Sequence, residues 1–94
     1  MAHVRMDPEE RKRLILDAAY KLARRAGFKK ATRAAIAAEA GVSPGLVGVY
    51  FGSREDLRTC IMQQAVQHKD KKTIREGLDL GVTSVRIPKE LRAA

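Results

Sequence analysis

Three residues with the spacing of a helix-turn-helix motif lie in the middle of the chain: Ala37, Gly41 and Val47. A small side chain at Ala37 lets a second helix approach the first closely, and Gly41 can adopt the positive φ of a tight turn. Val47 then packs the second helix of the motif against the first. The spacing therefore predicts a unit whose second helix enters the major groove of DNA.

A first helix is predicted ahead of this motif. Asp7 is its N-cap and Pro8 lies in its first turn, followed by the acidic pair Glu9 and Glu10. Gly27 ends the helix. Between these ends, apolar residues recur every three or four positions and form one buried stripe, which consists of Leu14, Ile15, Ala18, Ala19, Leu22, Ala23 and Ala26.

Cap residues set the bounds of three more helices. Thr32, Ser43 and Ser53 are N-cap residues, and Gly41 and Gly52 follow the ends of two of these helices. The predicted ranges are 32–40, 44–51 and 53–67, with the last helix fraying over residues 67–72. The sequence thus predicts an all-α fold, a small helical bundle that contains a helix-turn-helix.

The C-terminal residues give a less regular pattern. From Lys69 the chain either extends the fourth helix or forms another turn, and Gly77 interrupts both. The β-branched residues of Val82–Ile87 predict a short β-strand that pairs with a second copy across a dimer axis, with a disordered tail as the alternative. We therefore divide the chain into a DNA-binding domain, residues 1–67, and a C-terminal tail, residues 68–94, as a candidate dimerisation segment.

Composition limits the class of protein. The 94 residues suffice for one small domain, and 19 Lys and Arg against 11 Asp and Glu give a net charge of +8, which favours a nucleic acid as partner. A single cysteine, Cys60, favours a reducing compartment over secretion. Because there is no apolar run of about 20 residues and no signal peptide, we expect a cytoplasmic protein without membrane association.

The motifs R-L-I-L-D-A-A-Y-K-L-A-R-R-A-G-F, T-R-A-A-I-A-A-E-A-G-V-S-P-G and Y-F-G-S-R-E-D-L follow one another between about residues 11 and 66. This region resembles the DNA-binding domain of the TetR family of bacterial repressors. The resemblance implies a homodimer whose two helix-turn-helix units read successive major grooves of a palindromic operator. A usual member continues into an inducer-binding helical domain that these residues lack. We therefore expect no small-molecule effector, and dimerisation through the fourth helix, the tail or both.

The recognition helix departs from the family pattern. Leu46 and Gly48 stand where the family usually has a threonine and a tyrosine, and no residue of this helix can make a bidentate base contact. Base reading is therefore expected to be mostly apolar, with Leu46 against thymine methyl groups and Gly48 allowing close approach of the helix backbone. The residues expected to face DNA are Ser43, Pro44, Gly45, Leu46, Gly48, Val49 and Tyr50.

Phosphate contacts are assigned to three positions. The resemblance implies that Tyr50 and Arg54 grip the DNA backbone, because they match family positions that usually do so. Thr32 caps a helix whose N-terminal amides would face a phosphate.

Further basic residues surround these positions. Arg33 is the candidate for a guanine contact, with a phosphate contact or a solvated charge as the alternative. Lys29 and Lys30 lie near the same edge and add positive charge, unless they only solvate the surface. An N-terminal arm with His3 and Arg5 is a candidate for contact with the minor groove.

No constellation of residues predicts an active site. His3 and His68 have no further ligands at zinc-binding spacing, so no metal is expected. Cys60 is predicted to be a packed structural thiol rather than a redox sensor. The acidic pair Glu55 and Asp56 is explained by a helix N-terminus. We expect a protein that is not an enzyme and needs no cofactor.

These observations predict a transcriptional repressor that binds double-stranded DNA as a homodimer on a palindromic operator. Two alternatives stay open at this point. One is a helical protein-interaction module that modulates another regulator, which the weakly polar recognition helix favours. The other is an architectural protein that binds DNA without sequence preference, which the basic composition permits.

Overall fold

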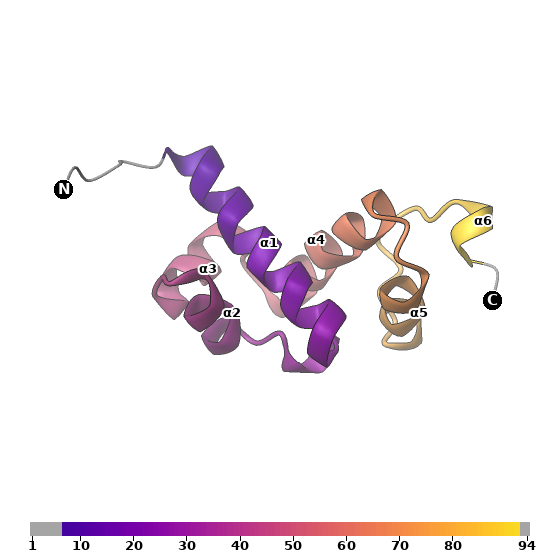
Figure 1. Ribbon diagram of the computed structural model, residues 1–94, viewed down its shortest axis with the longest axis horizontal. Coiled ribbons are helices and arrows are strands. Elements are labelled where there is room, and N and C mark those ends of the chain that lie inside the picture. Colours follow the sequence, from indigo (N-terminus) through magenta and orange to yellow (C-terminus); the bar gives the residue numbers. More distant parts are fainter. Residues whose placement is uncertain (1–6, 93–94) are drawn as a thin grey trace.

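The computed structural model describes residues 7–92, which form six α-helices and one short 3₁₀ helix, with no β-strand among them. The helical prediction is therefore confirmed, and Figure 1 shows the arrangement. The elements are α1 (Pro8–Ala26), η1 (Phe28–Lys30), α2 (Arg33–Ala40), α3 (Pro44–Phe51), α4 (Arg54–Gln67), α5 (Lys71–Asp79) and α6 (Lys89–Arg92).

The predicted cap residues begin the helices. The Asp7 carboxylate accepts the backbone N–H of Glu10 at 2.8 Å, and the Glu10 side chain accepts the N–H of Asp7, so that both close a capping box at α1. Thr32, Ser43 and Ser53 cap α2, α3 and α4 through their hydroxyl oxygens. These local hydrogen bonds explain why the predicted starts of the four helices agree with the structure.

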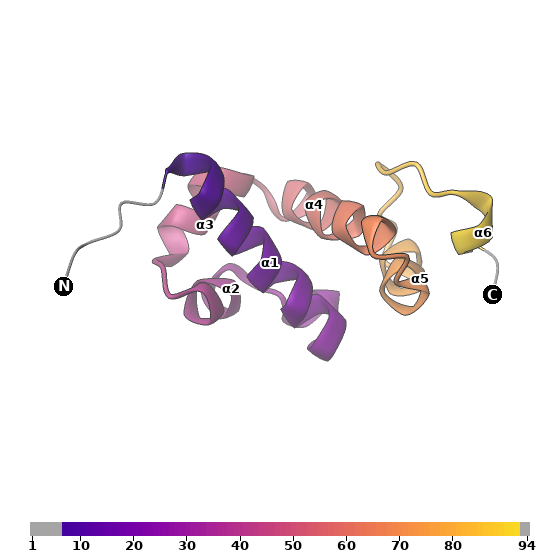
Figure 2. The same ribbon diagram turned by 45° about the horizontal axis from the view of Figure 1, so that its top comes forward.

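One hydrophobic core runs through the molecule. In both views α1 lies in the middle, with α2 and α3 on one side and α4 leading to α5 on the other (Figures 1 and 2). The most deeply buried large side chains are Ile15, Ile36, Val47, Ile61, Met62 and Ile74. Since Ile74 belongs to α5, the core extends beyond the helix-turn-helix region.

The stripe predicted on α1 is correct in its centre and wrong at its ends. Leu14 is 40% exposed and Ala26 is also exposed, whereas Ile15 is fully buried. Tyr20, which the apolar pattern missed, is buried instead. The buried part of α1 thus runs only from Ile15 to Ala23 and is shorter than the predicted stripe at both ends.

The strand predicted at Val82–Ile87 is wrong. This segment is an irregular connection between α5 and α6, and its end residues Val82 and Ile87 are buried in the same core as the helices. These two side chains thus pack within the chain without forming a strand. The boundary expected between residues 67 and 68 falls at the end of α4, and the division into two domains stays a prediction.

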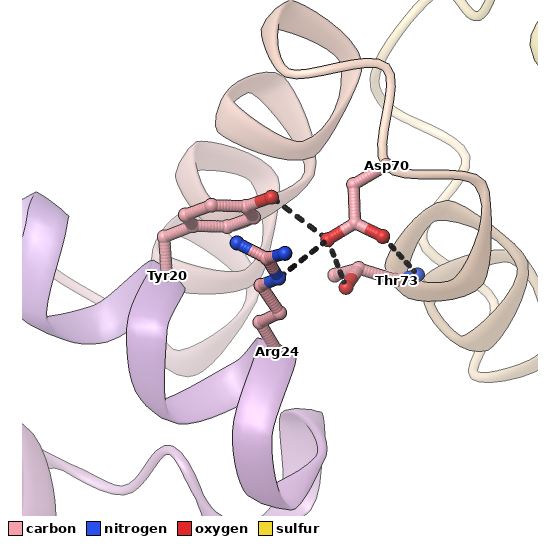
Figure 3. A network of polar contacts seen from close by, with 4 residues as sticks. All are labelled: Tyr20, Arg24, Asp70 and Thr73. Carbon is pink, nitrogen blue, oxygen red and sulfur yellow. Dashed lines mark hydrogen bonds and ion pairs between the residues drawn. The ribbon is translucent and has the colours of Figure 1, made fainter.

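A polar network fastens α5 to α1 (Figure 3). The Asp70 carboxylate caps α5 and accepts the Tyr20 hydroxyl at 2.7 Å and the Thr73 hydroxyl at 2.6 Å. Arg24 lies 3.9 Å away as an ion-pair partner, and the His68 ring stacks on Tyr20 at 4.9 Å between centroids. The Asp70 carboxylate and the Tyr20 and Thr73 hydroxyls therefore all have hydrogen-bond partners, as their burial requires.

This network shifts two pKa values in opposite directions. Burial, the Asp70 hydrogen bond and the negative charge of Asp70 raise the pKa of Tyr20 to about 12. Burial on its own would raise the pKa of Asp70, but hydrogen bonds from Thr73 and Tyr20 and the charge of Arg24 outweigh it and lower that pKa. The phenol therefore keeps its proton and the carboxylate stays ionised.

A second contact connects α5 to the joint ahead of α2. The Glu76 carboxylate accepts the backbone N–H of Phe28 at 3.0 Å, next to Gly27. One residue further, Gly77 is buried against Met62 and Phe28, where a Cβ would lie 3.0 Å from Phe28 Cζ and would collide with the Met62 methyl. The absence of a side chain at Gly77 thus lets α5 pack directly on α4 and on η1.

Among residues 7–92, no single helix has the length and apolar composition needed to cross a membrane. α2 and α3 pass that criterion only when taken together, across a bend of 107°.

Candidate nucleic-acid interface

The helix-turn-helix forms as the spacing predicts. Gly41 ends α2 in the left-handed conformation, with φ 72° and ψ 35°, and the Val42 N–H donates to the Ala37 carbonyl at 3.0 Å. Ala37 and Val47 are 2% and 1% exposed, so the two helices meet through these residues. The 107° turn between α2 and α3 lies within the range of a helix-turn-helix.

The outer face of α3 carries no charged side chain. Val49 is 79% exposed, Pro44 and Gly45 are also exposed, and Leu46 is half-buried. Because Val47 and Phe51 hold the opposite face in the core, the exposed face is fixed in place. Its contacts with base edges would be apolar, as the sequence predicts.

Arg33 lies across the recognition helix. Its guanidinium occupies the space above Gly48, where a Cβ would lie 3.1 Å from Arg33 Cζ. Its Nη2 donates to the Gly52 carbonyl at 3.4 Å, just beyond the end of α3. Arg33 therefore stabilises the C-terminal end of α3 and at the same time places a positive charge beside it.

A surface pocket of about 310 Å³ brings together Thr32 and Arg54, two of the three positions predicted to contact phosphates. Thr32 and Arg33 enter it from the start of α2, and Ser53 and Arg54 from the start of α4. Val47 and Phe51 of α3 form its apolar wall. The N-termini of α2 and α4, each with an arginine as its first residue, thus line one pocket. Each helix end offers backbone N–H groups and a partial positive charge to an anion.

Comparison with known proteins identifies the domain that carries this pocket. Residues 15–59 match the model of the bacterial regulatory proteins of the tetR family. The chain carries a TetR-type helix-turn-helix domain. No curated protein and no solved structure matches the chain. The TetR family consists of DNA-binding regulators rather than enzymes, and the domain therefore indicates a role in transcription regulation.

The remaining predicted residues of the described chain lie on η1 and at α3, outside the pocket lining. Lys29 and Lys30 are exposed on η1, the element directly ahead of α2. Ser43 is exposed and caps α3, and Tyr50 is half-buried on that helix outside the pocket. Their contacts with DNA stay predictions. His3 and Arg5 of the expected N-terminal arm lie outside the described residues.

Metal-ligating side chains and the thiol of Cys60 are two further features of residues 7–92. No group of three or more His, Cys, Asp or Glu side chains there is placed to hold a metal ion. Cys60 is half-buried on α4, and burial, partly offset by the charge of Lys12, raises the pKa of its thiol. A raised pKa disfavours the reactive thiolate, in line with a packed structural thiol.

Sequence reasoning missed the bond from Arg33 to Gly52 and the meeting of two helix starts in one pocket. The paired cap signals at Thr32 and Ser53, each followed directly by an arginine, are the only trace of this arrangement in the sequence.

Proposed function

We propose that the protein is a sequence-specific transcriptional repressor that binds a palindromic operator as a homodimer and blocks access to a promoter. Each copy inserts α3 into the major groove and holds the flanking phosphates with the residues around the pocket. Two copies read two half-sites about one helical turn apart. Repression without a small-molecule effector also stays a prediction.

The observation that carries this proposal is the pocket beside α3. It presents the N-termini of α2 and α4, together with Arg33 and Arg54, on the border of an uncharged helix face. Phosphate contacts position a protein on the duplex, while contacts to base edges give specificity. The pocket supports the first role, and the exposed face with Leu46 and Val49 supports the second.

Selection of bound duplexes from a random pool tests the proposal. At near-physiological salt, non-specific complexes have dissociation constants of roughly 10⁻⁴ to 10⁻⁶ M, so only specific sequences are retained. We expect enrichment of a palindrome with two related half-sites. Binding without any enrichment would instead favour an architectural protein, and failure to retain DNA would favour the protein-interaction module.

Two variants distinguish the phosphate contacts that position the protein from the base contacts that give sequence specificity. Arg54→Gln removes a phosphate contact, so it should weaken binding equally for all sequences and reduce the slope of log affinity against log salt by about 1. Leu46→Ala should relax the preference for thymine at one position of each half-site and leave that slope unchanged. Lys21→Gln, on the exposed side of α1, removes the same charge far from the pocket and serves as the control.

A further inference from the structure

A second cluster of basic residues lies on α5 and on the segment that leads through α6. It lines two adjoining surface grooves of about 380 and 530 Å³ that share Leu78 and Arg92. All of its cationic side chains are exposed. We call this cluster the C-terminal basic surface, and it consists of Lys71, Lys72, Arg75, Arg86, Lys89 and Arg92.

Little negative charge offsets these cations. Residues 71–92 contain six Lys and Arg but only three acidic residues, Glu76, Asp79 and Glu90, which leaves a net charge of +3. Glu76 is turned toward the Phe28 N–H, and Asp79 lies on the wall of one groove. Within residues 7–92, none of the six cations forms an ion pair. The surface therefore presents a positive potential to solvent.

The C-terminal basic surface lies far from the helix-turn-helix. The molecule measures 49 Å along its longest axis and about 20 Å across, and α2 and α3 lie toward one end while α5 and α6 lie at the other (Figures 1 and 2). A duplex bound across α3 leaves the opposite end open to another ligand.

The chemistry of the surface selects the kind of ligand. Single-stranded nucleic acid binds by stacking its bases on aromatic rings, and residues 71–92 contain no aromatic residue. An amphipathic acidic peptide needs an apolar anchor site, but Leu78 is half-buried and Leu91 is only 8% exposed. What remains is a set of separate exposed cations, which suits the regular phosphates of a duplex.

We propose that the C-terminal basic surface binds the phosphate backbone of a second DNA segment, so that one protein bridges two duplexes. The bridge rests on the proposed function, because the helix-turn-helix must hold the first duplex. The second contact is independent of sequence, since Lys and Arg reach only phosphates there.

A two-duplex capture experiment tests the bridge. One duplex with the selected operator is fixed to beads, and the protein is added with a second, fluorescent duplex of unrelated sequence. The triple variant Lys72→Gln, Arg75→Gln, Arg92→Gln should bind the fixed operator within twofold of the wild type but capture at least fivefold less fluorescent duplex. The control Lys12→Gln, Arg13→Gln, Lys21→Gln removes the same charge from the exposed side of α1 and should capture as much as the wild type.

A second measurement does not depend on the helix-turn-helix. In a background with Tyr50→Ala and Arg54→Gln, the salt dependence of binding to a duplex of unrelated sequence reports the remaining contacts. Adding the C-terminal triple substitution should reduce the slope of log affinity against log salt by about 2 to 3, since each lost phosphate contact removes about 0.9.

Three results would overturn the bridge. An unchanged slope in that background would show that this surface does not bind DNA. If both triple variants lose capture equally, the loss is caused by the lower net charge of the protein and not by the C-terminal basic surface. Capture by the C-terminal triple variant at the wild-type level would show that the second duplex binds elsewhere. If operator selection fails but the C-terminal triple substitution still reduces the salt slope, the result contradicts the repressor function and supports DNA binding by the C-terminal basic surface.

Discussion

The guanidinium of Arg33 lies over Gly48, so that the first residue of α2 occupies the space that a side chain on the recognition helix would fill. The same group donates to the Gly52 carbonyl at 3.4 Å. Glycine at position 48 therefore has a packing reason in addition to any close approach to DNA. The two residues form one unit in which α2 holds the end of α3.

Gly48→Ala separates the two roles of this unit. Alanine favours a helix over glycine, and the exposed Arg33 side chain can move by the few tenths of an ångström that a methyl group needs. We expect the free energy of unfolding in urea to rise by about 0.5 to 1 kcal/mol. DNA affinity should fall roughly fivefold, about 1 kcal/mol, because the new methyl group hinders the close approach of the helix backbone to DNA that Gly48 allows. A loss of stability would instead mean that Arg33 cannot move.

Gly77→Ala should lower the free energy of unfolding, whereas Gly48→Ala should raise it. Its new methyl group would collide with the Met62 side chain and lie 3.0 Å from Phe28 Cζ, in a part of the core with no space to spare. Such overpacking costs typically 1 to 3 kcal/mol, which should appear as a lower midpoint of urea unfolding. Gly45→Ala is the matched control, because a Cβ at this position has no other atom within 4 Å. This substitution should stabilise α3 by about 0.5 to 1 kcal/mol. Equal effects of both substitutions would contradict the packing argument.

The sequence predicts elements well where the signal is local. Thr32, Ser43 and Ser53 are read correctly as caps because each hydroxyl bonds to a backbone N–H three residues on. The turn at Gly41 is likewise a property of a few neighbouring residues. The bounds of the two helices of the helix-turn-helix follow from these local signals, and this explains their agreement with the prediction.

The C-terminal part was not predictable in the same way, because its features depend on distant residues. Gly77 interrupts the helical pattern in the sequence, yet it lies inside α5, where the position of Met62 excludes a side chain. Val82 and Ile87 have the composition of a strand, but the core offers them a place without one. The candidate site shows the same limit, since the bond from Arg33 to Gly52 spans 19 residues.

Asp70→Asn should destabilise the fold by about 1 to 2 kcal/mol near neutral pH. The Tyr20 and Thr73 hydroxyls donate to one Asp70 oxygen and the Thr73 backbone N–H donates to the other, so an amide with a single acceptor oxygen cannot serve both sides. Bonds to an ionised group are also the stronger ones. The folded pKa of Asp70 is lowered, so the stabilisation is present above its ordinary value of 3.8 and is lost as pH falls through the lowered pKa. The difference between wild type and variant in urea unfolding should therefore shrink below pH 3.8.

Tyr20→Phe provides the alkaline counterpart. Because the pKa of Tyr20 is raised from 10.0 to about 12, the stabilisation by its hydroxyl is complete below pH 10 and is lost as pH rises toward 12. The free-energy difference between wild type and Tyr20→Phe should thus be constant from pH 5 to 9 and decline above pH 10. A decline that begins near neutral pH would contradict the bond to Asp70.

The contact between Glu76 and Phe28 connects α5 to the helix-turn-helix. Glu76→Ala leaves the N–H of the buried Phe28 without its acceptor, and an unpaired buried donor costs about 1 to 3 kcal/mol. Asp79→Ala removes an exposed carboxylate from the same helix and should change stability by less than about 0.5 kcal/mol. Urea unfolding measures both effects, and hydrogen exchange at the Phe28 amide should quicken only in Glu76→Ala.

The same substitution should also weaken DNA binding. Phe28 begins η1, which runs directly into Thr32 and the start of α2, so a loosened η1 lets the pocket residues lose their shared position. Operator affinity of Glu76→Ala should therefore fall by a larger factor than that of Asp79→Ala, measured well below the temperature at which either variant unfolds. Both variants remove one negative charge from α5, so the net charge of the protein is the same in the two. An equal affinity for the operator would mean that α5 stabilises the domain without ordering its DNA-binding face.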